Sequence, residues 1–198
     1  MLSIDNLSFY YKKDKCILKD VSVDIKPGIN VLLGKNGVGK STLIRILAKV
    51  QKSSSRISLN GLPISHSTYL DHIAYLPQNF SLYENLKVCE IIEFVASMKG
   101  IQKEERKNLV NTILEQAHIT EYKNMFFSKC SEGTKRRVGI AALLIGKYDL
   151  YLLDEPTAGL DPVERNNFYS IVKDNMKDKT VIISTHIMDD LAYMSDFI

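Results

Sequence analysis

The sequence predicts an α/β fold in which a mostly parallel sheet is flanked by helices. Two observations support this. Strands alternate with helices along most of the chain, and residues 150–153 and 181–183 are apolar throughout, as expected for parallel strands buried on both faces. Residues 1–28 alternate in strand fashion and indicate an added N-terminal antiparallel β subdomain. With 198 residues, 45% of them hydrophobic, the chain can bury one sizeable core.

The N-terminal part contains short strands and one amphipathic helix. Residues 10–15 read as an exposed, basic hairpin loop between two strands. Residues 29–33 form an apolar run, and residues 41–50 have the spacing of an amphipathic helix. Residues 56–59 predict a strand that ends in an Asn-Gly turn, and residues 73–76 predict another that a proline ends.

The middle of the chain is predicted to be helical. Apolar residues recur at helical spacing over 88–98 and again over 109–117, and a third helix is expected from about 131 to 145. After the strand at 150–153, Asp161 has the pattern of an N-cap for a helix that runs to about Met176, followed by a strand at 180–184.

Composition places the protein among reduced, water-soluble globular proteins. The net charge of +3 is too small to indicate a nucleic-acid partner by itself. Cys16, Cys89 and Cys130 are widely spaced and odd in number, which favours reduced cytosolic thiols over disulfides or a metal site. The N-terminus lacks a signal-peptide layout, and we expect a cytoplasmic protein.

A glycine-rich segment between the strand at 29–33 and the following helix has the P-loop pattern. Glycines let the backbone wrap around phosphates, and the helix start directs N–H groups at them. Lys40 would reach the outer phosphates, and the Ser41 hydroxyl would ligate magnesium. The sequence therefore predicts binding of ATP, or another nucleoside triphosphate, with Mg²⁺. The segment comprises Gly34, Lys35, Asn36, Gly37, Val38, Gly39, Lys40, Ser41 and Thr42.

Two acidic residues follow the apolar strand at 150–153. In P-loop ATPases an acid at this place holds magnesium, and Asp154 is the candidate. Glu155, one residue further on, is positioned to accept a proton from an attacking water as general base.

Taken together, these motifs resemble the ATP-binding cassette (ABC) family over essentially the whole chain. The resemblance implies that Gln78, in Leu-Pro-Gln, senses magnesium and the terminal phosphate. It implies that His186 holds the γ-phosphate and the water, and that Asp161 crosses to a partner subunit. Tyr11 sits where the family stacks an aromatic ring on adenine, with Tyr10 as the alternative.

One motif departs from the family pattern. The family signature is L-S-G-G-Q, whereas this chain reads Cys-Ser-Glu-Gly-Thr from residue 130. Ser131 and Gly133 are kept, and Ser131 can cap the next helix. Glu132 adds a carboxylate where phosphate is expected, and its repulsion would weaken ATP-driven closure. Lys135 and Arg136 could offset part of this charge.

The resemblance also implies a domain layout and a function. We expect one nucleotide-binding domain over 1–198, with the ATPase core in 1–84 and 132–198 and a helical subdomain at about 85–131. The function implied is that of an ATP-hydrolysing subunit of an exporter-like membrane transporter. Its partners would be a separate transmembrane permease, which would hold it at the inner face of the membrane, and a second ABC ATPase subunit. No nucleic-acid partner is expected.

Two other functions are alternatives: a soluble, non-transport ABC ATPase acting on ribosomes or DNA, and a small-molecule kinase. Family members usually continue with a further strand, whereas this chain ends at Asp196-Phe197-Ile198, where that strand would begin. The sequence leaves open whether the chain is naturally short or truncated.

Overall fold

The structure, a computed structural model, describes residues 1–12 and 15–194. Contacts divide the chain into two compact units. The first contains Met1–Tyr75, Tyr148–Pro156 and the chain from Met176 onward. The second contains Leu76–Lys147 and Thr157–Asn175. The second compact unit is larger than the helical subdomain expected at about 85–131, because it also includes residues 132–147 and 157–175. The division into an ATPase core and a helical subdomain stays a prediction.

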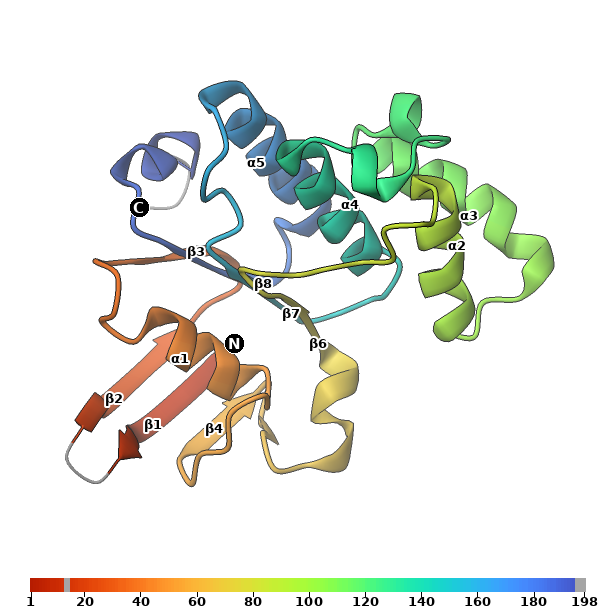
Figure 1. Cartoon of the computed structure of the whole chain (residues 1–198). Coiled ribbons are helices and arrows are strands. Elements are labelled where there is room, and N and C mark those ends of the chain that lie inside the picture. Colours follow the sequence, from red (N-terminus) through yellow and green to blue (C-terminus); the bar gives the residue numbers. More distant parts are fainter. Residues whose placement is uncertain (13–14, 195–198) are drawn as a thin grey trace. The chain divides into compact units, whose positions relative to one another are not determined.

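The first unit contains an antiparallel sheet with strand order β2-β1-β4-β5 (Figure 1). Inward residues of β1, among them Leu2 and Leu7, are fully buried against α1, whose Ile44 and Leu47 are also fully buried. This packing accounts for the strand-like alternation at the N-terminus. The elements are β1 (Leu2–Lys12), β2 (Lys15–Ile25), β4 (Arg56–Leu59), β5 (Leu62–Pro63), α1 (Lys40–Leu47) and the 3₁₀ helix η1 (Ser67–His72).

A second sheet in this unit has the order β3-β8-β7-β6 (Figure 1). Strand β8 pairs in parallel with both β3 and β7, and every residue of β7 and β8 is buried, which confirms the prediction from their apolar runs. Because parallel strands end at the same edge of a sheet, the segments after Leu33, Asp154 and Thr185 emerge together. The strands are β3 (Gly28–Leu33), β6 (Ile73–Leu76), β7 (Leu150–Asp154) and β8 (Thr180–Thr185), and η4 (Met188–Met194) follows.

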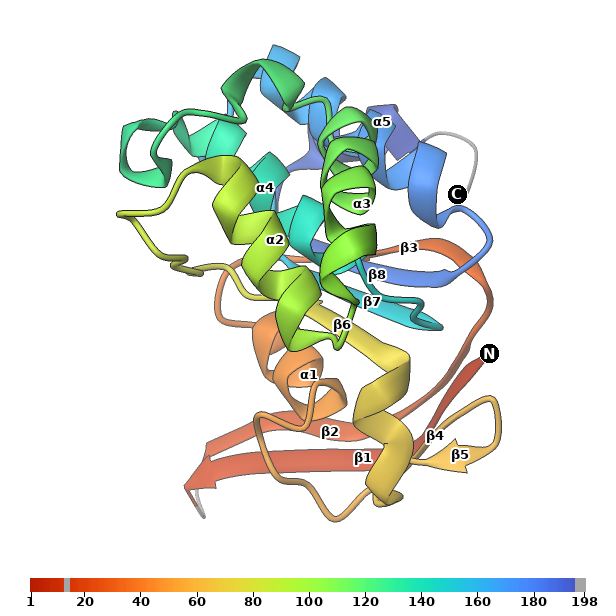
Figure 2. The ribbon, with the colours of Figure 1, turned by 90° about the vertical axis from the view of Figure 1, so that its right-hand side faces the viewer.

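The second unit is helical (Figure 2). Residues of α2, α3 and α4 form an apolar cluster that includes Ile92, Leu114 and Val138. Helix α2 begins with a capping interaction in which the Lys87 N–H donates to the Glu90 carboxylate at 2.8 Å. The helices are α2 (Val88–Met98), α3 (Lys103–Gln116), α4 (Glu132–Leu144) and α5 (Pro162–Met176), with η2 (Thr120–Tyr122) and η3 (Phe127–Lys129) between α3 and α4.

The predicted elements are all present, with two differences at their ends. The expected loop at 10–15 is wrong in extent, because β1 continues through Tyr10 and Tyr11 and pairs Tyr10 with Cys16 across the hairpin. Helix α1 ends at Leu47 rather than near residue 50, because Lys49 adopts a left-handed conformation with φ 56°. The expected end at Asp196-Phe197-Ile198 lies outside the described residues.

The three cysteines are free thiols, as expected. Among residues 1–12 and 15–194, no helix combines the length and the apolar character needed to cross a bilayer.

Candidate functional site

The P-loop follows β3 and leads directly into α1. Gly37 and Gly39 have φ of 83° and 106°, which side-chain-bearing residues rarely adopt. A Cβ on Gly39 would also lie 3.0 Å from the Leu18 side chain and 3.2 Å from the Ile17 carbonyl. Gly39 is therefore required for close packing against β2 as well as for the turn, and the turn leaves the first N–H groups of α1 facing into the loop.

Lys40 is nearly buried, and its ammonium group lies inside the loop. Its Nζ donates to the carbonyl oxygens of Gly34 at 2.7 Å and Lys35 at 3.1 Å. It also lies 3.6 Å from Oε1 of Glu155. The positive charge is thus held at the concave side of the P-loop, as phosphate binding requires.

Asp154, at the end of β7, is 1% exposed and is fixed by two hydroxyl groups. Its Oδ1 accepts hydrogen bonds from Ser41 at 2.9 Å and from Ser184 at 2.6 Å. Its Oδ2 is buried and has no hydrogen-bond partner within the described part of the chain. A buried carboxylate oxygen without a partner costs free energy unless a cation satisfies it. With the adjacent Ser41 hydroxyl, this donor set fits the predicted magnesium ion.

Glu155 lies between the two basic residues of the site. Its backbone has φ 45°, and its N–H donates to the hydroxyl and the carbonyl of Ser184 at 2.9 and 3.2 Å. Its carboxylate oxygens lie 3.6 Å from Lys40 Nζ and 3.5 Å from His186 Nδ1, and the His186 side chain is 38% exposed. Such a carboxylate can accept a proton from a water molecule approaching from the His186 side.

The structure identifies two supporting residues that were missing from the predicted site. Ser184 links Asp154 and Glu155 through the hydrogen bonds given above. Asp190 is fully buried and accepts a hydrogen bond from the Thr185 hydroxyl at 2.5 Å, while the same hydroxyl accepts from the Ile187 N–H at 3.0 Å. These bonds order the turn that carries His186. The available signal for Ser184 was a polar residue directly after the apolar run 181–183 in a predicted buried strand.

Of the two candidate aromatic residues, Tyr11 is the one in contact with the P-loop segment. Its hydroxyl lies 3.3 Å from the Thr42 hydroxyl, and its ring contacts Phe9 edge-on with 5.0 Å between centroids. Tyr11 as a whole remains 51% exposed. Tyr10 instead interacts with Cys16, whose hydrogen bond and charge raise the pKa of the phenol. The contact favours Tyr11 for the predicted role beside adenine.

The remaining predicted site residues, Gln78, Ser131, Gly133 and Asp161, lie in the second unit. Ser131 caps α4, since its hydroxyl accepts from the Thr134 N–H at 3.1 Å. Asp161 caps α5 in the same way, by accepting from the Glu164 N–H at 2.9 Å. Both predicted caps are confirmed.

The non-family residue Glu132 is exposed in the first turn of α4. Its carboxylate pairs with Lys135 at 3.1 Å, three residues along the same helix. The expected compensation by Lys135 is therefore present. The guanidinium of Arg136 donates to the Gln78 carbonyl at 2.7 Å and lies over the Phe80 ring.

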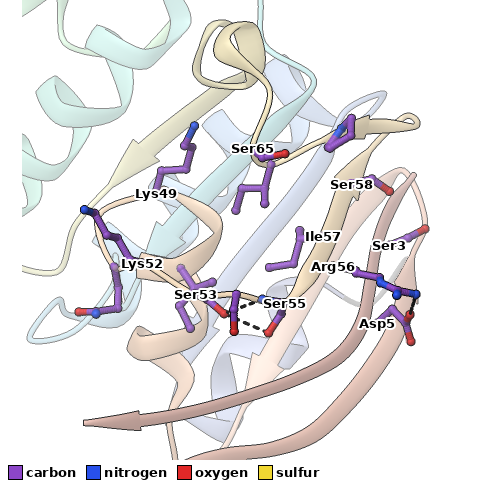
Figure 3. Close-up of a pocket in the computed structure, with 15 residues that line it drawn as sticks. Ser3, Asp5, Lys49, Lys52, Ser53, Ser55, Arg56, Ile57, Ser58 and Ser65 are labelled. Carbon is purple, nitrogen blue, oxygen red and sulfur yellow. Dashed lines mark hydrogen bonds and ion pairs between the residues drawn. The ribbon is translucent and has the colours of Figure 1, made fainter.

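A cavity of about 760 Å³ also lies in the first unit, apart from the P-loop (Figure 3). Ile57 faces α1, whereas Asp5 and Arg56 project from the opposite face of the sheet (Figure 3). The lining of the cavity consists of Ser3, Asp5, Ile46, Lys49, Gln51, Lys52, Ser53, Ser54, Ser55, Arg56, Ile57, Ser58, Pro63, Ile64 and Ser65.

The fold is that of ATP-binding subunits of ABC transporters. A solved ATP-binding subunit of an ABC transporter superposes with a TM-score of 0.81 at 27% identity, covering 98% of this chain and 82% of that one. The structure of cbiO1 from Clostridium perfringens, described as part of the ABC transporter complex cbiONQ, superposes with a TM-score of 0.84 at 29% identity and covers 98% and 81%.

The chain belongs to the ABC transporter family, whose pattern it matches over residues 18–158. It is 36% identical to the linearmycin resistance ATP-binding protein LnrL of Bacillus subtilis over 99% of this chain. It is 31% identical to an ABC transporter ATP-binding protein of Methanocaldococcus jannaschii over 98% of this chain and 71% of that protein. The chain spans 64% of the length of LnrL and 11% of the organic anion transporter ABCA8A of Mus musculus.

Proposed function

We propose that this chain binds ATP with Mg²⁺ and hydrolyses it, and that it does so as the ATPase subunit of a membrane transporter. The observation that carries the proposal is the convergence of three groups at one edge of the parallel sheet: the Lys40 ammonium, the Glu155 carboxylate and the Asp154 Oδ2, which has no hydrogen-bond partner among residues 1–12 and 15–194. Each matches a requirement of phosphoryl transfer to water: binding of the phosphates, binding of the metal and acceptance of a proton.

The P-loop amides and Lys40 would hold the β- and γ-phosphates of the substrate. Ser41 and Asp154, together with Gln78 on the strength of the family resemblance, would hold magnesium. When bound, the ion supplies positive charge to the phosphate oxygens. Glu155 would accept the proton as water attacks the γ-phosphorus, so that ADP and inorganic phosphate are released.

His186 and Ser184 would set the geometry of that proton transfer. The His186 imidazole, 3.5 Å from Glu155, would orient the water and the γ-phosphate. Ser184 holds the Glu155 backbone N–H and the Asp154 side chain, so one hydroxyl orders both acids. We assign Tyr11 to stacking on adenine.

A second ABC ATPase subunit would complete the reaction. We propose that Ser131, Gly133 and Asp161 act toward the nucleotide of that partner, as the family resemblance implies. Binding energy for ATP would favour the closed pair, and hydrolysis would allow it to reopen. Glu132 would weaken closure at the partner's site.

We propose that the transporter is an exporter with a separate transmembrane permease, and that the chain lies at the cytoplasmic face of the membrane. LnrL is named for resistance to linearmycin, and resistance is most directly provided by outward transport. Other relatives are named as transporters of organic anions or of glucosylceramide, which also places similar sequences in membrane transport.

The hydrolytic assignment is tested by Glu155→Gln. The variant should bind ATP at least as tightly as the wild type, because Lys40 loses a competing carboxylate, and hydrolyse it about 10² or more times slower, the range for loss of a general base. Lys40→Ala should lose ATP binding. Glu93→Gln, on the exposed side of α2, is the matched control. Hydrolysis at the wild-type rate by the Glu155 variant would reject the assignment.

The transport assignment is tested by purifying the full chain from detergent-solubilised, nuclease-treated membranes. Stoichiometric recovery with a multi-span membrane protein, and stimulation of ATPase activity by that protein, is the expected result. Recovery with ribosomes or DNA and stimulation by nucleic acid would instead support the non-transport alternative.

A further inference from the structure

Arg136, in the second turn of α4, contacts the loop that follows β6. Its Nη1 donates to the main-chain oxygen of Gln78 at 2.7 Å, and its guanidinium lies over the ring of Phe80, 5.4 Å from the centroid. Burial lowers the pKa of Arg136, and the charge of Glu132 opposes this shift. A charged donor to a carbonyl, shielded by an aromatic ring, is a stronger contact than an exposed hydrogen bond.

Residues on both sides of Gln78 pack against α4 at Gly139, three residues after Arg136. A Cβ at Gly139 would lie 2.6 Å from Phe80 Cζ and 3.0 Å from Leu76 Cδ1. The Phe80 ring therefore packs directly on the helix backbone, as does the Leu76 side chain. The segment from Leu76 to Phe80 is thus anchored at three points: both ends by packing, and its centre by Arg136.

The neighbouring basic residues of α4 have different partners. Lys135 pairs with Glu132, and Arg137 donates to the His118 carbonyl at 2.7 Å and lies 3.4 Å from Glu164. The contact with the Gln78 main chain is therefore specific to Arg136 among these three consecutive residues. A change at this position acts on the loop and leaves the other two contacts of the helix in place.

We propose that Arg136 is a positioning residue for Gln78. By holding the Gln78 carbonyl, it restricts the backbone torsions that direct the carboxamide, so that only side-chain rotation remains for Gln78 to reach magnesium. This inference rests on the proposed role of Gln78 in ATP hydrolysis. It also makes α4, which begins at the altered signature, a direct support of the loop that carries Gln78.

The test compares Arg136→Met with Arg106→Met in the full chain. Arg106 is a matched control, because its Nε also donates to a main-chain carbonyl, that of Ile101, at 2.7 Å. Arg136→Met should raise the Mg²⁺ concentration for half-maximal ATPase activity at least about fivefold, and Arg106→Met should change it less than about twofold. Arg136→Lys should restore part of the effect, since lysine can donate to the carbonyl but lacks the planar group that stacks on Phe80.

A double-mutant cycle separates positioning from general stabilisation. In a Gln78→Ala background, Arg136→Met should produce no further change in Mg²⁺ dependence, because the side chain that it positions is gone. Amide hydrogen exchange of the peptide containing Leu76–Phe80 should be faster in Arg136→Met and unchanged in Arg106→Met.

The inference is overturned if both methionine variants behave alike, or if Arg136→Met shifts the Mg²⁺ dependence equally with and without the Gln78 side chain. Absence of ATPase activity in the wild-type protein would instead reject the proposed function. In that case the exchange experiment alone would decide whether Arg136 orders the loop.

Discussion

Substitution of Gly133 tests whether this signature residue must be glycine because the Glu164 side chain packs against it. It lies in the first turn of α4, and a Cβ at this position would be 2.4 Å from Glu164 Cδ and 2.5 Å from Oε2. Non-bonded carbon atoms pack at about 3.5–4.0 Å, so Gly133→Ala would create an overlap of more than about 1 Å. The Glu164 side chain must shift to relieve it.

That shift is costly because Glu164 has a buried partner. Its Oε1 lies 3.4 Å from Arg137 Nη2, and the Arg137 side chain is only 7% exposed. Displacing the carboxylate would leave a buried guanidinium with less compensation. We therefore expect Gly133→Ala to destabilise the protein by about 1–3 kcal/mol, as for overpacked sites. For a chain of this size the midpoint of thermal unfolding should fall by about 2–12 °C.

The effect of Gly133→Ala on stability should change sign when the obstructing Glu164 side chain is removed. In a Glu164→Ala background, Gly133→Ala has no carboxylate to displace, and alanine is favoured over glycine inside a helix by up to about 1 kcal/mol. There the substitution should be neutral or raise the midpoint. Circular dichroism melts of the four proteins provide the measurement. An equal loss in both backgrounds, or no loss in either, would refute the packing explanation, and a selective loss of ATPase activity would assign Gly133 to the nucleotide site alone.

Three further predictions concern side chains whose environment the structure describes. Ser184→Ala should lower ATPase activity about tenfold, because both acids lose a hydrogen bond, while Ser170→Ala, on an exposed helix face, should leave the rate unchanged. Glu132→Gly should raise the ATPase rate of a homodimer by up to about fivefold, and the gain should shrink with added salt; an unchanged rate at low salt would contradict a role for this charge. Iodoacetamide should label the exposed Cys16 well before Cys130, because burial raises the pKa of the Cys130 thiol and so reduces its thiolate fraction. Mass spectrometry of a labelling time course provides the measurement, and labelling of Cys130 first would contradict the prediction.

Local sequence patterns were sufficient for much of this fold. The glycines of the P-loop, the caps at Ser131 and Asp161 and the buried strands β7 and β8 each depend on interactions within a few residues, or on a periodicity that one stretch of chain carries by itself. The parallel pairing of β8 with β3 and β7 brings the segments after these strands to one carboxyl edge of the sheet.

The tertiary structure alone decided which distant groups contact those motifs. No local pattern indicates that Ser184 bonds Asp154 across 30 residues, that Gly133 must leave room for Glu164, or that Arg136 reaches the Gln78 carbonyl. Each depends on how two strands pair, or on how a helix packs against its neighbours, and these are set by the burial of whole apolar faces rather than by the residues concerned. The sequence by itself thus determined the chemistry of the P-loop and the acids, and the packed chain determined what supports them.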